Sequence, residues 1–175
     1  MKHLISDKNG KEYFLRIARI DDLAVINAIY NEAIGTRRCT GHMVEFAPQD
    51  RTDWFYDHPQ DKFPIYVCEN EGKIIGYIHI SPFKERQAFS GDVEITYYID
   101  FLHQGLGIGS AMMSFMLEKS KELGYEFVIA TLLSLNEKSI GLLTKFGFSQ
   151  WGRLPSIMNM GEGVRCDFLI YGLKL

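Results

Sequence analysis

Residues 93–110 read VEITYYIDFLHQGLGIGS, and they are the most informative part of the chain for its fold. A β-branched and aromatic segment runs into closely spaced glycines and then directly into an apolar helix pattern that extends to Leu117. Glycine lets the backbone turn sharply and lets N–H groups approach a ligand without an intervening Cβ. The free N–H groups and positive dipole end of the helix suit a phosphate or pyrophosphate. Because no Lys or Arg lies between His103 and Leu117, we expect the backbone to hold most of such an anion.

The elements around this strand–turn–helix unit predict a mixed α/β sheet. Strands are predicted at residues 12–18, 65–69, 73–80, 92–100, 125–133, 148–153 and 166–175. Helices are predicted at residues 21–34, 48–58, from the glycine turn to 123, and 137–146. Short turns between strands predict antiparallel pairing in the first half, and the strand–helix–strand unit predicts one parallel pair. We expect about seven strands, mostly antiparallel, flanked by about four helices.

Composition narrows the class of protein. The 175 residues are 46% apolar and 23% charged, which is typical of one compact domain spanning residues 1–175. A net charge of −3 argues against a nucleic-acid partner held by a basic face. Three widely spaced cysteines favour a reducing compartment. Residues 1–10 lack a signal-peptide pattern. No stretch of the sequence has the run of about 18 apolar residues that a membrane helix needs. We therefore expect a soluble, cytoplasmic protein with no membrane partner.

Two familiar nucleotide motifs fit the glycine turn poorly. A P-loop needs a Gly-Lys-Ser/Thr ending, which the turn lacks. A Rossmann fingerprint needs a third glycine where Ser110 stands, and an acidic residue about 20 positions further on. The next strand, FVIATLL, brings no such acid.

A third motif fits. Residues 104–109, QGLGIG, resemble the Gln/Arg-x-x-Gly-x-Gly/Ala signature of the GNAT superfamily of acetyl-CoA-dependent N-acetyltransferases. Similar pieces follow in the expected order: IYN at 29–31, VEITYYI at 93–99, Asn136 with Ser139, and GF at 147–148. Within that superfamily the chain resembles the phosphinothricin N-acetyltransferase-like branch, through FKERQAF at 83–89, WG at 151–152 and Asp167. The resemblance covers residues 13–175.

The resemblance implies a GNAT-like fold whose parallel strands splay apart, and transfer of acetyl from acetyl-CoA directly to a substrate amine. It places the general base at Glu94, where desolvation would raise the carboxyl pKa toward a useful range. A solvated strand residue is the plain alternative for Glu94. The residues that the resemblance implies for cofactor binding are Tyr97, Tyr98, Ile99, Gln104, Gly105, Leu106, Gly107, Ile108, Gly109, Ser110, Asn136 and Ser139. Asn136 is equally well explained as an N-cap.

One position departs from the family pattern. Seven residues after Asn136, where many members carry a Tyr and this branch often a His, the chain has Leu143. The usual proton donor to the leaving thiolate is therefore in doubt. A thiol pKa of about 8.5 lets the thiolate leave without much help.

The acceptor is expected to be a small amino-acid-like amine of the phosphinothricin or methionine sulfone type. Arg86 and Lys84 match the substrate-side loop of the branch, and an Arg there suits a carboxylate, although a solvated loop is a strong alternative. Arg37, Arg38 and Arg165 are weaker candidates.

Two other functions stay open: acetylation of a protein or peptide N-terminus, and acyl-CoA binding without catalysis. Cys39 and His42 have metal-like spacing but no partner pair, so we expect no metal. The resemblance also implies a homodimer.

Overall fold

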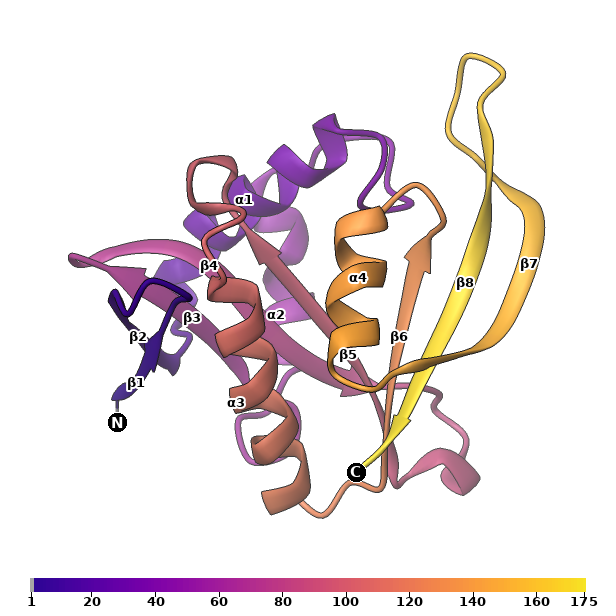
Figure 1. The fold of residues 1–175 in the computed structure, drawn as a ribbon. Coiled ribbons are helices and arrows are strands. Elements are labelled where there is room, and N and C mark those ends of the chain that lie inside the picture. The colour runs from indigo at the N-terminus through magenta and orange to yellow at the C-terminus, as the bar shows by residue number, and fades with distance from the viewer. Residues whose placement is uncertain (1) are drawn as a thin grey trace.

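The computed structural model describes residues 2–175; Met1, the first residue of the predicted domain, lies outside them. Eight strands form one sheet in the order β1-β2-β3-β4-β5-β6-β8-β7 (Figure 1). Neighbouring strands are antiparallel except for β5 and β6, so the predicted mixed sheet with one parallel pair is confirmed, with eight strands rather than about seven. The strands are β1 (Lys2–Ser6), β2 (Glu12–Ile17), β3 (Ile65–Asn70), β4 (Lys73–Pro82), β5 (Asp92–Ile99), β6 (Phe127–Leu133), β7 (Ser149–Asn159) and β8 (Arg165–Lys174).

Four α-helices cover the two faces of this sheet. They are α1 (Leu23–Gly35), α2 (Thr52–Tyr56), α3 (Ile108–Glu122) and α4 (Glu137–Lys145). Alternate residues of β3 show the two layers: Tyr66 and Cys68 pack with the core under α3 and α4, whereas Ile65 and Val67 pack with α1 and α2. In Figure 1, α3 and α4 lie in front of the sheet. A cavity that contacts both helix layers must therefore pass through the sheet that separates them.

The strand β1 is missing from the elements that the sequence pattern predicts. It is short, lies at the edge of the sheet and leaves Leu4 54% exposed, so its apolar pattern is weak. A tight turn joins it to β2, in which Asp7 Oδ1 accepts the backbone N–H groups of Asn9 and Lys11 at 2.8 and 3.0 Å. This turn brings Lys8 against the distant glycine turn, where Lys8 N donates to Leu106 O at 3.3 Å.

The parallel pair separates soon after it forms. β5 and β6 are in register only over residues 92–94 and 127–129. Beyond Glu94, β5 stays paired with β4 and β6 stays paired with β8, so a gap opens between their inner edges. The Asp100 N–H donates to Ile75 O on β4, and peptide direction alternates along a strand. The peptide groups of Ile95, Tyr97 and Ile99 therefore face the gap, as the resemblance implies for a splayed pair.

Candidate active site

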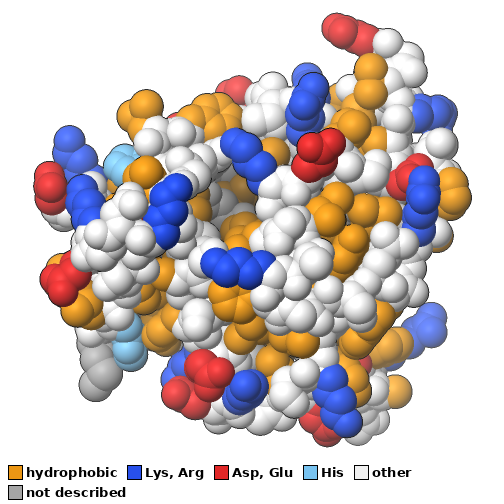
Figure 2. Space-filling model, in the orientation of Figure 1, with side chains coloured by type: hydrophobic (Ala, Val, Ile, Leu, Met, Phe, Trp, Pro, Cys, Tyr) orange, Lys and Arg blue, Asp and Glu red, His pale blue; other side chains and the backbone are white. Residues whose placement is uncertain are grey.

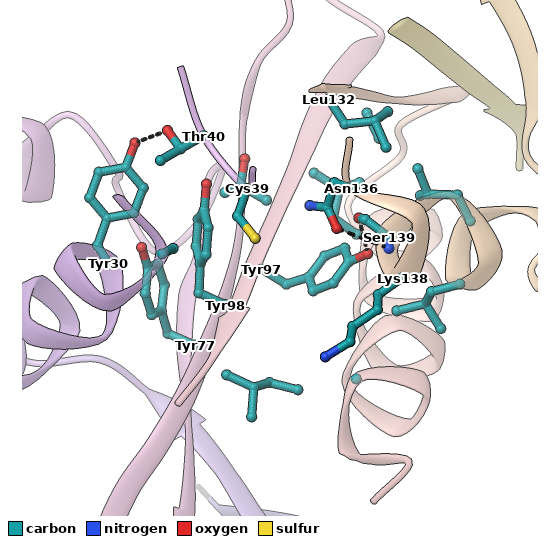
Figure 3. A pocket seen from close by; sticks show the side chains of 18 of the residues that line it. Tyr30, Cys39, Thr40, Tyr77, Tyr97, Tyr98, Leu132, Asn136, Lys138 and Ser139 are labelled. Carbon is teal, nitrogen blue, oxygen red and sulfur yellow. Dashed lines mark hydrogen bonds between the residues drawn. The ribbon is translucent and has the colours of Figure 1, made fainter. Parts of the chain in front are cut away.

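A cavity of about 1310 Å³ passes through the gap between β5 and β6. Its walls come from α4 on one side of the sheet and from α1, α2 and residues 39–42 on the other. Figure 3 shows Tyr97 and Tyr98 pointing to opposite sides of β5 inside it. The predicted site residues that line the cavity are Glu94, Tyr97, Tyr98, Ile99, Gln104, Gly105, Gly107, Gly109, Ser110, Asn136 and Ser139.

Four predicted residues lie outside this lining. Ile108 is buried and Leu106 partly buried in the core, so their backbone alone is available to a ligand at the turn. Lys84 and Arg86 are exposed on the loop before β5. The structure does not bring either side chain into the cavity wall.

The glycine turn needs glycine at Gly107 for two reasons. Its φ of +100° lies in the left-handed region, and a Cβ there would come within 2.9 Å of Lys8 N. The helix α3 begins at the next residue, so the N–H groups of its first turn point out of the helix end beside the cavity. This end can hold an anion through its backbone.

Three lysines from other parts of the chain surround this turn. Lys8 Nζ donates to Gly105 O at 2.9 Å, Lys138 Nζ to Gln104 Oε1 at 3.2 Å, and Lys145 Nζ to Ser110 Oγ at 3.0 Å. All three line the cavity, and Figure 2 shows a hollow in this face with Lys and Arg side chains around it. These lysines were not predicted from the sequence, from which we expected the backbone to hold most of an anion. Lys138 and Lys145 are seven residues apart and so share one face of α4, which is the signal that was available.

Two side chains connect β5 to α4 on this side of the sheet. The Tyr97 hydroxyl lies 2.5 Å from Ser139 Oγ, and the Asn136 side chain accepts the Ser139 backbone N–H at 3.2 Å. Asn136 is therefore the N-cap of α4, as one of its two interpretations predicts. Burial raises the pKa of Tyr97 to about 12, so its hydroxyl stays protonated at neutral pH. Leu143, on the same helix, is 1% exposed and offers the cavity only hydrocarbon.

Glu94 stands where β5 and β6 begin to separate. Its carboxylate accepts a hydrogen bond from Thr131 Oγ1 on β6. Burial raises the carboxyl pKa, and the Thr131 hydroxyl and the positive charge of Lys84 offset part of that rise. A partly desolvated carboxylate at the mouth of the gap is suited to accept a proton from an amine.

The far side of the cavity is aromatic. The Tyr30 hydroxyl lies 2.8 Å from Thr40 Oγ1 (Figure 3). It also lies 2.5 Å from His42 Nδ1. Trp54, Tyr77 and Tyr98 complete this wall. Cys39 and His42 both line the cavity, and within residues 2–175 no group of three or more His, Cys, Asp or Glu side chains is placed to hold a metal ion.

The split sheet and the glycine turn at the start of α3 match the arrangement that the GNAT resemblance implies. The sequence model of the acetyltransferase (GNAT) family matches residues 26–148. The chain therefore belongs to the GNAT family of acetyltransferases.

Comparison with individual relatives shows which members of this family the chain is similar to. The chain is 35% identical over 162 residues to the Bacillus subtilis protein YwnH, whose name provisionally assigns a phosphinothricin acetyltransferase; the match covers 92% of this chain and 98% of YwnH. It is 28% identical to the L-methionine sulfoximine/L-methionine sulfone acetyltransferase of Pseudomonas aeruginosa, covering 82% and 84% of the two chains. The structure of a phosphinothricin acetyltransferase from Sinorhizobium meliloti in complex with acetyl-CoA superposes with a TM-score of 0.87 at 27% identity, covering 93% and 88%. No helix within residues 2–175 is both long and apolar enough to span a membrane.

Proposed function

We propose that this acetyltransferase moves the acetyl group of acetyl-CoA to the primary amine of a small amino-acid-like acceptor of the phosphinothricin or methionine sulfone type. The observation that carries the proposal is the position of Glu94, a desolvated carboxylate at the mouth of a gap through the sheet. The activities for which the Pseudomonas and Sinorhizobium relatives are named support the acceptor class.

The residues present fit acetyl-CoA as the co-substrate. The first turn of α3 and the three lysines Lys8, Lys138 and Lys145 offer donors and positive charge to its phosphates. The outward peptide groups of Ile95, Tyr97 and Ile99 offer hydrogen bonds to an extended arm in the gap. Asn136 and Ser139 lie on the opposite wall beside the Tyr97 hydroxyl. When bound, acetyl-CoA supplies an activated acyl carbon.

The chain's own residues then have distinct tasks. Glu94 accepts one proton of the substrate ammonium, so that the free amine attacks the acyl carbon. As the carbon–sulfur bond breaks, the nitrogen loses a second proton, which protonates the departing thiolate. A β5 N–H that faces the gap stabilises the negative charge that develops on the acyl oxygen. The thiolate leaves readily because the pKa of a thiol is only about 8.5, which makes a strong acid at the Leu143 position unnecessary.

We also propose that residues 1–175 act as one domain and that the chain forms a homodimer in the cytoplasm. The edge strand β7 supports association, because its apolar side chains Trp151, Leu154 and Ile157 are 44–56% exposed. Three free cysteines fit a reducing compartment. Sedimentation equilibrium of the purified chain tests the dimer, and a monomer at micromolar concentration would contradict it.

The function is tested by release of free CoA from acetyl-CoA in the presence of different acceptors. The acceptors are phosphinothricin, methionine sulfone, methionine sulfoximine, a polyamine and a short peptide. We expect turnover with the amino-acid acceptors and its loss in Glu94→Gln. Turnover confined to the peptide would favour N-terminal acetylation, and acetyl-CoA binding without turnover on any acceptor would favour a binding module.

A further inference from the structure

Arg51 is a buried arginine that the mechanism above does not use. It ends a short 3₁₀ turn (Pro48–Arg51) that leads into α2, and only 7% of it is exposed to solvent. Nevertheless it lines the cavity, on the side of the sheet covered by α1 and α2. A guanidinium stays charged at any physiological pH, so burying it without a counter-charge is costly.

The surroundings of Arg51 provide shape but no counter-charge. Its guanidinium carbon lies 4.0 Å from the centre of the Trp54 ring and 4.5 Å from the centre of the Tyr30 ring. Within residues 2–175 no carboxylate forms an ion pair with it, and its Nη1 atom has no hydrogen-bond partner. The carboxylate of the adjacent Asp50 accepts the Ala47 backbone N–H instead.

Two more polar atoms on the same wall lack a hydrogen bond of normal geometry among the described residues. The Tyr77 hydroxyl and His79 Nδ1 are buried in β4 and line the cavity, and the Tyr77 hydroxyl faces the Arg51 guanidinium. Burial and the charges of His58 and Arg51 lower the pKa of His79, so its ring is neutral. Unsatisfied buried polar groups are rare in folded proteins, so these atoms need a polar ligand or ordered water in the cavity as their partner.

This wall also lies on the correct side of the sheet for the acceptor. Tyr98 packs with the α1 and α2 layer. Glu94 is four residues before it on β5, so its side chain leaves the same face of the strand. Arg51 and the proposed base therefore face the same half of the cavity, opposite the glycine turn and α4.

We propose that Arg51 binds the carboxylate of the acceptor amino acid and thereby selects amines that carry an anionic group. This proposal rests on the proposed function. It assigns the carboxylate to Arg51 in place of the exposed Arg86 and Lys84. An arginine packed against two aromatic rings presents its planar donors in a restricted direction, which suits two parallel hydrogen bonds to a carboxylate. The counter-charge that the fold does not provide is then provided by the substrate.

The test compares acceptors with and without a carboxylate. Arg51→Met, Arg51→Lys and the exposed control Arg19→Met are assayed with methionine sulfone and with its carboxamide, which keeps the amine and side chain. In Arg51→Met we expect kcat/KM for methionine sulfone to fall about a hundredfold, mainly through KM. For the carboxamide we expect a change of less than about threefold, and KM for acetyl-CoA should be unaffected in both cases. Arg51→Lys should restore part of the loss, because it keeps the charge but not the planar donors.

Several results would overturn the proposal. One is an equal loss of activity with both acceptors in a folded Arg51→Met protein, judged by its melting temperature and CoA affinity. Another is a selective loss in Arg86→Met while Arg51→Met behaves like wild type, because the carboxylate would then bind at the exposed loop. If Arg51→Met does not fold, Arg51→Lys alone decides, with a loss of about tenfold expected for methionine sulfone only.

A binding measurement separates this proposal from the proposed function. Calorimetry follows methionine sulfone binding to the protein–CoA complex, which requires no turnover. Binding to the wild type that disappears in Arg51→Met supports the carboxylate site even if no acceptor is acetylated. If the wild type binds no methionine sulfone, or the variant binds it equally well, Arg51 is not the carboxylate-binding group.

Discussion

Thr131 Oγ1 donates a hydrogen bond to Glu94 Oε1 across the point where β5 and β6 stop pairing. The two strands are in register at Glu94 and Ile129 and separate beyond it, so Thr131 lies just inside the gap. The same split that opens the cavity therefore also supplies the hydroxyl that orients the proposed base. It stabilises the ionised carboxylate and limits the rise in its pKa that burial causes.

Replacing Glu94 by Gln should remove most of the activity. Gln keeps the size of the side chain but accepts no proton, so we expect kcat to fall between about a hundredfold and ten-thousandfold. Steady-state CoA release measures the loss, and KM for acetyl-CoA should stay close to the wild-type value. Glu85→Gln, on the exposed loop before β5, is the matched control. Full activity in Glu94→Gln would move the base to another residue.

The pH profile should report the environment of Glu94. Burial raises its pKa above the ordinary 4.5, and only the ionised form accepts a proton, so kcat/KM should rise with pH through that raised pKa. Thr131→Val removes a hydrogen bond to the ionised form, so the acid limb should shift upward by about one pH unit. An unchanged acid limb in Thr131→Val would show that another group controls it.

The stability of Glu94→Gln should depend on pH in the opposite sense to that of a salt-bridged acid. A carboxyl whose folded pKa is raised stabilises the protein below its unfolded pKa and loses that contribution as pH rises through the folded value. As the pH rises from 4 to 8, the free energy of unfolding of the variant should therefore increase relative to that of the wild type. Urea unfolding at the two pH values measures this, and a relative loss of stability on raising the pH would contradict the direction of the shift.

Gly107→Ala should weaken both the fold and acetyl-CoA binding. A methyl group at φ +100° is strained, and it would contact Lys8 N at 2.9 Å. We expect a loss of about 1–2 kcal/mol in the free energy of unfolding. We also expect a higher dissociation constant for acetyl-CoA by calorimetry. The control is Gly35→Ala at the end of α1, where a Cβ meets nothing within 4 Å. Equal behaviour of the two variants would mean that the turn tolerates a side chain.

The lysines around the turn should recognise phosphate rather than the acyl group. Lys145→Met should raise KM for acetyl-CoA by about twofold to fivefold at low salt, because exposed charges contribute modestly, and less at high salt. KM for S-acetylpantetheine, which lacks the nucleotide phosphates, should not change. Lys73→Met on β4, outside the cavity lining, is the control. A similar rise in KM for both thioesters would contradict phosphate recognition.

Arg16→Met should destabilise the fold in a pH-dependent way. Arg16 donates to Asp22 at 2.6 and 2.9 Å and to Glu69 at 2.7 Å, and all three side chains are largely buried. Losing the guanidinium should cost about 3 kcal/mol of unfolding free energy at pH 7. The exposed pair of Lys11 and Glu71, 4.0 Å apart, provides the control Lys11→Met.

The direction of that pH dependence follows from the carboxyl groups of Asp22 and Glu69, whose pKa values are both lowered in the folded protein. Burial alone would raise the pKa of Asp22, but the hydrogen bonds from Arg16 and from Arg19 N–H outweigh it and lower the pKa below 3.8. Stability from such a group is present above its unfolded pKa and is lost as pH falls through the folded value. The difference in the free energy of unfolding between wild type and Arg16→Met should therefore become smaller below about pH 4, as urea unfolding curves would show. If that difference does not change with pH, the loss of stability comes from packing and not from the ion pairs.

Local patterns predicted the helices and most of the strands well. The periodicity at residues 21–34 and 137–146 matches α1 and α4 closely, and the short helix predicted at 48–58 is a 3₁₀ turn followed by α2. The turn at residues 70–72 correctly predicts the β3–β4 hairpin. β1 was missed because an exposed edge strand of five residues carries little apolar pattern. The predicted roles of the individual site residues remain predictions until the variants above are measured.

The strand, glycine turn and helix at residues 93–122 could be predicted from the residues alone, and so could an anion at the helix start. Neighbouring residues determine such units, because turn chemistry and apolar periodicity act over a few positions. Their surroundings depend on contacts between distant parts of the chain. Lys8 reaches the turn from 97 positions away, and sheet pairing brings Thr131 to Glu94. Arg51 enters the far wall because helix packing, which no local pattern encodes, buries it against Tyr30 and Trp54.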